Sequence, residues 1–409
     1  MAKGPNYLKR KLACKRARVE TRYRYYDMKE SHVNRNLFVP SEMLYKFSPK
    51  LGWCTKAVNA LADRLQLRGF SHDNFNMLGI YQMNNMDVLC DSAILGALIS
   101  SCDFIYISSD ADGFPRLQVI DGGNATGIMD EITGMLTEGY AVLERDGKGN
   151  PLTELYFEPF RTTIYKKDME PYVVEHTAPY PLLVPIVYRP DAKRPFGHSR
   201  ISRSCMKYQD NTADTLVNMY ICSEVYAFPQ KYLLGTSPDM EMSQERARMS
   251  SFLRLDKDED GDKPSVGQFN QSSMAPYLDE IKAQASLFAG ETGLTIDDLG
   301  FTQSNPSSAE SIKASHESLR LEARKAQRSF GIGFLNVGYL GACLRDGIPY
   351  KRNQVYMTKP TWEPIFEPDA GAIGAIGDAA IKINQAVPGY FNEENLRELT
   401  GLDGGNNEY

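Results

Sequence analysis

The chain has 409 residues, of which 42% are hydrophobic and 24% charged, so its composition is that of a globular protein and its length predicts two or three folding units. Its 46 basic and 52 acidic residues give a net charge of −6, which excludes a protein that coats duplex DNA through overall positive charge. The first residues carry no apolar signal region, and no apolar run approaches the roughly 20 residues of a membrane span, so we expect a cytoplasmic protein that does not enter a membrane.

The N-terminal segment is strongly basic. Residues 3–24 contain nine Lys and Arg residues and one acidic residue, Glu20. Two interpretations stand: the segment is a solvated helix face or a frayed arm, or it is an arm that binds nucleic acid or a partner protein.

Two helices and a β-rich layer follow. Apolar residues recur at helical spacing over 53–67 and over about 83–100, and the second helix is apolar on more than one side, which predicts burial between layers. From about 103 to 190 the pattern changes to short β-branched and aromatic runs separated by turn sequences such as DADGF and DGKGN. This pattern is typical of antiparallel strands joined by tight turns.

Two long helices bracket a compact insertion. Residues 201–227 lack Pro and Gly and carry a broad apolar stripe, which predicts a helix that Pro229 ends. Residues 228–272 contain two possible strands, QKYLLG and SSFLRLD, and an acidic turn. A further helix opens at Ser273, has Pro276 in its first turn, where the missing N–H costs little, and carries an apolar face.

A polar loop then leads to a long helix that contains several glycines. The loop is longer than most connections in compact domains, so we expect it to be functional or mobile. Ser307 and Glu310 form a capping box for the helix, and glycines in its second half predict a kink or break near Gly331. The C-terminal part has one strand pattern, over 353–366, and two short helices, with Asn392 as an N-cap.

The acidic turn matches the start of a calcium-binding loop and then departs from it. Asp256, Asp258 and Asp260 reproduce the alternating carboxylates, but the twelfth position, which must supply a bidentate Glu, is Gly267. A calcium site, a two-metal nuclease cluster and a solvated docking surface are the alternatives, and the mismatch favours the docking surface.

No catalytic motif stands out. The five histidines are scattered without metal-ligand spacing, and no GxSxG, P-loop or complete dinucleotide fingerprint occurs. The seven cysteines contain no CxxC pair and are expected to be reduced thiols. We therefore expect a protein that is not an enzyme and needs no cofactor or metal. The alternative is a metal-dependent DNA-processing enzyme that uses the acidic turn 256–262.

Three stretches carry a resemblance to a known family: LGWCTKAVNALADRLQLRGF (51–70), PFGHSRISRSCMKYQDNTADTLVNMYICSEVYAFPQKYLLG (195–235) and LFAGETGLTIDDLGFTQSNPSSAESIKASHESLRLEARKAQRSFGIGF (287–334). They are similar to the portal proteins of tailed bacteriophages, of the siphophage head-to-tail connector type. The third stretch is the most specific, because its Gly-Glu-Thr, Leu-Gly, Asn-Pro and Ser-Ala-Glu elements occur in order at the expected spacing. The resemblance covers roughly residues 20–400.

The resemblance implies an α+β portal fold in a dodecameric ring at one capsid vertex, a conduit for DNA packaging and ejection. Its parts would be an α/β wing, a two-helix stem, a small β-rich clip, a tunnel loop, a kinked tunnel helix, a wing strand and a short helical crown. In chain order they would span 1–200 (wing), 201–227 (stem), 228–272 (clip), 273–291 (stem), 292–307 (tunnel loop), 308–346 (tunnel helix), 347–368 (wing strand) and 369–409 (crown).

The resemblance also implies three groups of site residues. Stem packing would use Tyr208, Leu216, Met219, Leu278, Ile281 and Phe288. Docking at the clip would use Asp256, Asp258, Asp260 and Asp262. The tunnel loop would face DNA with Asp297, Asp298, Gln303, Ser304 and Asn305, of which the two aspartates would repel phosphates and the others would make weak, exchangeable contacts.

The implied partners are other copies of the chain, the large terminase subunit, a head-tail adaptor protein, the major capsid and scaffolding proteins, and double-stranded DNA that passes without sequence specificity. No membrane partner is expected. The chain would be assembled in the host cytoplasm and located in the virion. For the basic residues of the tunnel helix, ion pairing between subunits is favoured over DNA contact; these residues are Lys313, Arg320, Arg324, Lys325 and Arg328.

Overall fold

The computed structural model describes residues 3–29, 49–227, 231–234, 265–268, 273–301, 314–366 and 370–400. The chain divides into two compact units. Unit 1 comprises residues 1–30, 52–206 and 289–409, and unit 2 comprises residues 31–51 and 207–288. Helices and antiparallel strands are mixed in the chain, so the expected α+β class is confirmed. No helix among the described residues is both long and apolar enough to cross a membrane.

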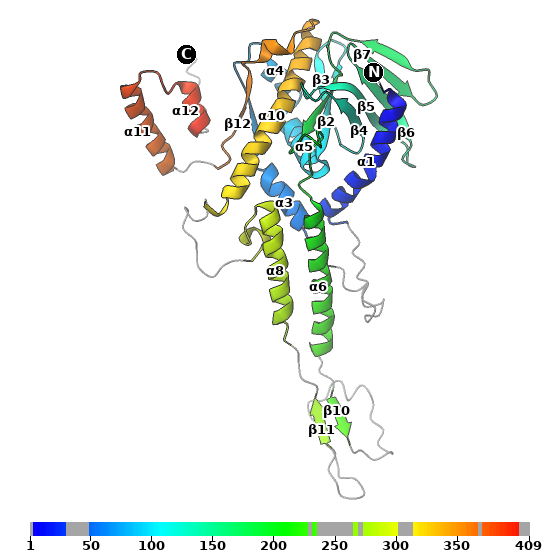
Figure 1. Cartoon of the computed structure of the whole chain (residues 1–409), viewed down its shortest axis with the longest axis vertical. Coiled ribbons are helices and arrows are strands. Elements are labelled where there is room, and N and C mark those ends of the chain that lie inside the picture. Colours follow the sequence, from blue (N-terminus) through cyan, green and yellow to red (C-terminus); the bar gives the residue numbers. More distant parts are fainter. Residues whose placement is uncertain are drawn as a thin grey trace, which may run out of the picture. The chain divides into compact units, whose positions relative to one another are not determined.

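Two antiparallel sheets make up the β layer of unit 1 (Figure 1). The larger sheet is a five-stranded meander in which each strand pairs with the next along the chain, as tight turns between short strands dictate. Its strands are β4 (Ala125–Met129), β5 (Leu136–Arg145), β6 (Pro151–Glu158), β7 (Arg161–Lys166) and β8 (Tyr172–Glu175). The smaller sheet has the order β3-β2-β9, with β2 (Cys102–Ser109), β3 (Pro115–Ile120) and β9 (Leu183–Val187). The strands predicted between residues 103 and 190 are therefore present.

Several helices accompany these sheets in unit 1. The helix predicted from about residue 83 begins later, because Asn85 is in the left-handed conformation with φ 52°. A short helix before it was not predicted; the carboxylate of Asp73 accepts hydrogen bonds from the backbone N–H groups of Met77 and Leu78 and so caps this helix. The helices of this region are α1 (Pro5–Tyr26), α3 (Trp53–Ala62), α4 (Met77–Gln82) and α5 (Met86–Ser100).

The C-terminal part of unit 1 begins with the long helix α10 (Glu317–Asp346). The 3-10 turn η2 (Arg352–Val355) and strand β12 (Lys359–Trp362) follow, and β12 pairs antiparallel with β1 (Leu67–Ser71). The two predicted short helices are α11 (Ala370–Ala386) and α12 (Glu393–Thr400). The side chain of Asn392 accepts a hydrogen bond from the Asn395 N–H at 2.9 Å, which confirms the predicted N-cap.

The predicted break near Gly331 is wrong, since α10 runs unbroken for 30 residues, while the alternative of a kink stays a prediction. Its glycines are sites of close packing. A Cβ atom on Gly331 would lie 2.5 Å from Cγ of Pro360, and one on Gly333 would lie 2.8 Å from Cδ1 of Ile186. The absence of a side chain therefore lets β9 and β12 approach the helix closely, and this packing outweighs the low helix propensity of glycine.

Gly331→Ala is expected to destabilise the protein by about 1–3 kcal/mol, because Pro360 is a rigid ring within a paired strand and cannot yield cheaply. Gly377→Ala in α11 is the matched control: no atom lies within 4 Å of its added Cβ, so helix propensity should stabilise it by up to about 1 kcal/mol. Denaturant unfolding of both variants measures the difference. Equal stabilisation by both substitutions would show that Gly331 serves as a flexible point after all.

Unit 2 holds most of two long helices and a short strand pair. Helix α6 (Arg203–Ala227) precedes β10 (Lys231–Leu234), and β11 (Ser265–Gln268) precedes helix α8 (Ala275–Thr292). β10 and β11 pair antiparallel, so the predicted strand in QKYLLG is confirmed. The second predicted strand, SSFLRLD at 251–257, lies outside the described residues.

Candidate functional site

The apolar faces of α6 and α8 are partly used within the chain. Ile281 and Phe288 of the predicted stem-packing set are buried, at 6% and 0% exposure. The other four residues of that set are more open: Tyr208, Leu216 and Met219 are half-buried and Leu278 is 47% exposed. The buried side of α6 instead runs through Cys205, Gln209, Thr212, Ala213 and Val217. The chain therefore leaves apolar surface on both helices, and its use in packing between copies stays a prediction.

The distal ends of α6 and α8 lie side by side in unit 2. The sulfur of Cys222 is 3.1 Å from the hydroxyl of Tyr277, so the end of the first helix meets the start of the second (Figure 1). The β10–β11 pair joins the two helices beyond this point.

Arg200, just before the start of α6, links this region of unit 1 to the end of α8. Its side chain is 3% exposed, and it donates hydrogen bonds to the carbonyl of Ala57 in α3 (3.1 Å), to the carbonyl of Thr292 at the end of α8, and to the carboxylate of Glu322 in α10. Burial alone would lower the pKa of Arg200, but Tyr188 and Glu322 outweigh it and the pKa is raised, so the guanidinium stays charged. The guanidinium of Arg200 thus links three helices, α3, α8 and α10.

Two further contacts reinforce this junction. The hydroxyl of Ser202, next to the start of α6, donates to the carboxylate of Glu291 at 2.9 Å. Gly293, which follows α8, has φ +67°, and a Cβ there would lie 2.9 Å from the hydroxyl oxygen of Ser318 at the start of α10. The backbone therefore turns sharply between α8 and α10 at a position that only glycine fills without strain.

The first part of the predicted tunnel loop is an ordered turn. Asp297–Leu299 form the 3-10 turn η1, and the carboxylate of Asp298 accepts hydrogen bonds from the N–H (2.9 Å) and hydroxyl (2.8 Å) of Thr295. Asp298 also lies 3.7 Å from Nδ1 of His316. Its carboxylate is thus engaged in holding the turn, whereas Asp297 is exposed. The part of this loop with Gln303, Ser304 and Asn305, and the capping box of Ser307 and Glu310, lie outside the described residues.

The acidic residues of the clip also lie outside the described residues; they are Asp256, Asp258, Asp260 and Asp262. Their docking role stays a prediction. Within the described part of the chain, no three His, Cys, Asp or Glu side chains are grouped so that they could hold a metal ion.

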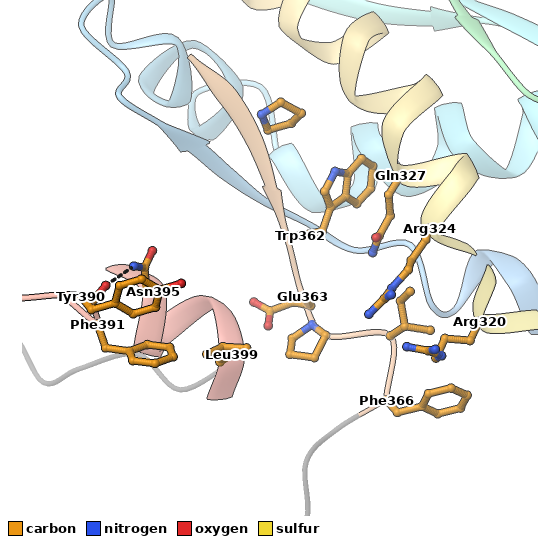
Figure 2. A pocket seen from close by; sticks show the side chains of 13 residues that line it. Arg320, Arg324, Gln327, Trp362, Glu363, Phe366, Tyr390, Phe391, Asn395 and Leu399 are labelled. Atoms are coloured by element: carbon orange, nitrogen blue, oxygen red, sulfur yellow. Dashed lines mark hydrogen bonds between the residues drawn. The ribbon is translucent and has the colours of Figure 1, made fainter. Parts of the chain in front are cut away.

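An open pocket of about 960 Å³ lies between α10, the β12 segment and α12 with the residues just before it (Figure 2). Arg320 and Arg324 of α10 face it from one wall, together with Trp362 of β12, and Tyr390 and Leu399 face it from the other. Arg320 is paired bidentately with Glu317, at 2.6 Å for both bonds, so this cation is paired within the chain, whereas pairing between subunits was predicted for it. No sequence motif predicted this pocket, because the residues that line it come from three segments that are separated in the sequence.

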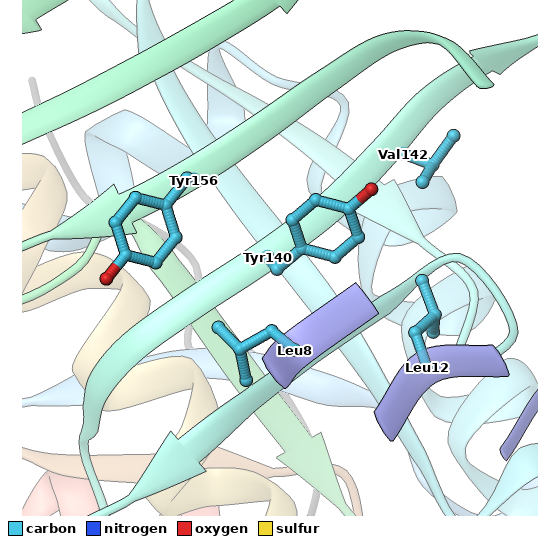
Figure 3. Close-up of a cluster of buried hydrophobic side chains, with 5 residues drawn as sticks. All are labelled: Leu8, Leu12, Tyr140, Val142 and Tyr156. Atoms are coloured by element: carbon cyan, nitrogen blue, oxygen red, sulfur yellow. The ribbon is translucent and has the colours of Figure 1, made fainter. Parts of the chain in front are cut away.

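The basic N-terminal segment is a helix that packs on unit 1, so the frayed-arm interpretation is wrong. Leu8 and Leu12 of α1 are buried against a cluster on β5 and β6 (Figure 3). The cluster consists of Tyr140, Val142 and Tyr156.

Several cations of α1 are used by the fold itself. Lys11 donates to the carbonyl of Gly127 at 2.6 Å, Arg22 donates to the carbonyl of Ser100 at 2.8 Å, and Lys9 pairs with Glu154. Arg10 and Arg18 remain on the exposed side, as the solvated-face interpretation expects. The charge available to an external ligand is therefore much smaller than the sequence suggests.

No protein-family model matches the chain, and no curated protein matches it by sequence. Solved structures are similar at low identity. One belongs to the virion of a native gene transfer agent particle, with 13% identity, 94% of this chain and 99% of that chain covered, and a TM-score of 0.46. Two more belong to the neck of an empty particle computed with C6 symmetry (14% identity, 91% and 96% covered, TM-score 0.47) and to the neck of a native particle computed with C12 symmetry (14% identity, 91% and 97% covered, TM-score 0.44).

Proposed function

We propose that the chain is a portal protein: twelve copies form a ring at a capsid vertex that conducts double-stranded DNA. The observation that carries the proposal is the contact between the residue that precedes α6 and the end of α8. From Arg200 the chain runs through α6, the β10–β11 pair and α8 to Thr292, to whose carbonyl Arg200 donates a hydrogen bond. This order is that of a stem, a clip and a second stem helix, as the sequence resemblance implies.

The charges support a conduit that does not grip DNA. Each Lys or Arg contact to phosphate adds salt-dependent affinity, which would slow translocation, and the chain has a net charge of −6. In the turn after α8, Asp297 is the exposed carboxylate and is the residue that we propose faces DNA. The ring would occupy the virion, and the large terminase subunit, the head-tail adaptor, and the capsid and scaffolding proteins would be its partners.

The mass of the purified protein tests the ring directly. Size-exclusion chromatography with light scattering should give about 550 kDa, twelve times the chain mass of 45.9 kDa, and negative-stain images should show rings. A monomer or a dimer under all conditions of salt and concentration would refute the proposal.

Leu287→Asp is expected to abolish the ring while the single chain still folds. Leu287 is 52% exposed on α8, so within one chain the change costs little, but in a ring it would place a carboxylate in each of the apolar contacts between stems. Ala283→Asp, also exposed on α8, is the control for added charge. Light scattering should show small species for Leu287→Asp and rings for Ala283→Asp, with equal helix content by circular dichroism. Intact rings of the Leu287 variant would exclude this face from the interface.

A further inference from the structure

The C-terminal end of α5 brings α1 together with the residues that precede α6. Arg18 and Arg22 lie one helical turn apart on α1, and Arg22 donates to the carbonyl of Ser100, the last residue of α5, at 2.8 Å. Residues 199–200, just before α6, donate hydrogen bonds to the carbonyls of residues 98–99. Successive carbonyls at one helix end therefore hold the two segments close together.

Four arginines gather where these segments meet, and we name them the arginine cluster: Arg18, Arg22, Arg194 and Arg203, all in unit 1. Arg203 is the first residue of α6, and Nη1 of Arg194 lies 3.1 Å from Nδ1 of His198. Burial and repulsion from the other three arginines lower the pKa of Arg22 to about 10, and no carboxylate contributes to this shift. The four positive charges are therefore close enough to act on one another.

The charge of the arginine cluster is not neutralised within the described part of the chain. No described carboxylate forms an ion pair with any of the four guanidiniums. The acidic residues beside them have other partners: Asp191 binds His198 at 2.6 Å, and Glu20 binds Arg16 at 2.7 Å. The carbonyl that Arg22 binds carries no net charge. An anion that entered the cluster would relieve the repulsion among its members.

The surroundings of the arginine cluster favour phosphate over the acidic face of a protein. In α1 from Leu8 onward, and in residues 189–207, no large apolar side chain is exposed. Interfaces between proteins have an apolar core, which this surface lacks. Arg18, Arg194 and Arg203 are exposed, and the planar fork of N–H donors on a guanidinium matches two oxygens of one phosphate.

We propose that Arg18, Arg194 and Arg203 bind phosphates of a DNA duplex, and that the half-buried Arg22 adds its charge to the site. The choice of DNA as the source of the phosphates rests on the proposed function, whereas the site itself lies within one chain and does not require the ring. Three phosphate contacts give an affinity that falls steeply with salt concentration. The duplex is therefore held weakly at physiological ionic strength and can still move, as a conduit requires.

Fluorescence anisotropy of a labelled DNA duplex of mixed sequence, titrated with the full-length chain at several salt concentrations, tests the proposal. The triple variant Arg18→Gln, Arg194→Gln and Arg203→Gln should weaken binding at least about tenfold at low salt. It should also reduce the slope of log K against log salt concentration by about 3, one for each lost phosphate contact. Arg18→Gln alone should reduce the slope by about 1. Arg22 is retained because it binds α5.

The matched control removes three exposed lysines near strands β6 and β7, Lys148, Lys166 and Lys167, by substitution with Gln. Both triple variants lose the same charge, so only the position of the charge differs, and the control should keep the natural slope. Replacing the three arginines of the site by lysine retains the charges and should keep most of the slope, which provides a second comparison if the Gln variant does not fold. Circular dichroism checks the fold of each variant.

An unchanged slope in the arginine variant, or equal losses in both triple variants, would overturn the inference. Light scattering on the same samples keeps the two proposals apart: intact rings with an unchanged slope refute only the DNA site, and a monomer that binds DNA through the arginines refutes only the ring. Displacement of the duplex by inorganic phosphate at equal phosphate concentration would reassign the site to a small phosphate ligand. Binding of polyglutamate and not of DNA through these arginines would reassign it to an acidic protein.

Discussion

Arg200→Ala is expected to lower the free energy of unfolding by about 3–5 kcal/mol, the range for breaking a buried ion pair by removing one partner. The substitution leaves the Glu322 carboxylate, whose side chain is 18% exposed, without its buried partner, and it removes the donors to the carbonyls of Ala57 and Thr292. Since these groups belong to three helices, the loss loosens the base of α8 and the start of α10 together. Denaturant unfolding at fixed protein concentration measures the change.

Arg189→Ala provides the control, because Arg189 pairs with the same carboxylate at 3.1 Å but its side chain is 58% exposed. Its removal should cost less than about 1 kcal/mol, as for other surface ion pairs. The double variant Arg200→Ala with Glu322→Ala should be less destabilised than the two single changes added together, because no unpaired charge is left. Similar losses for Arg189→Ala and Arg200→Ala would show that burial of Arg200 does not give the junction its strength.

The stability of unit 1 is expected to fall as pH rises from about 4 to about 7, because of Asp103. Burial raises the pKa of this carboxyl from its ordinary value to about 7, and the hydrogen bond from Ser100, at 2.6 Å, only partly opposes the shift. In this window the folded chain keeps a proton that the unfolded chain has lost, so folding becomes less favourable as pH increases. The full shift corresponds to a loss on the order of 4 kcal/mol.

Asp103→Asn should abolish this loss. An asparagine retains the oxygen that accepts the hydrogen bonds from Ser100 and from the N–H of Gly122, but it does not titrate. Lys15 and Asp121 also act on the group, and burial lowers the pKa of Lys15. Unfolding free energies measured at pH 5 and pH 8 should differ for the natural chain and agree for the variant. A natural chain with the same stability at both pH values would contradict the prediction.

Local features of the sequence determined where most elements lie. The 3.6-residue period over 201–227 and the alternating runs between 103 and 190 predicted α6 and the two sheets, because burial of one face imposes these periods wherever the element is placed. Asn392 and Pro276 predicted helix starts for the same reason: a cap or a missing N–H acts on the backbone next to it.

Tertiary structure decided the structural roles of the charged residues and of the glycines. Nothing near Arg200 in the sequence indicates Glu322, 122 positions away, as its partner, and nothing near Gly331 indicates that Pro360 packs on it. The basic run of α1 likewise suggested a free arm, yet Lys11 and Arg22 bind carbonyl groups of unit 1. Unlike the apolar residues of a helix or strand, a single charged residue or glycine forms no periodic pattern in the sequence that would reveal its partner. Its role depends on which distant backbone or side chain the fold brings within a few ångströms, and that is a property of packing alone.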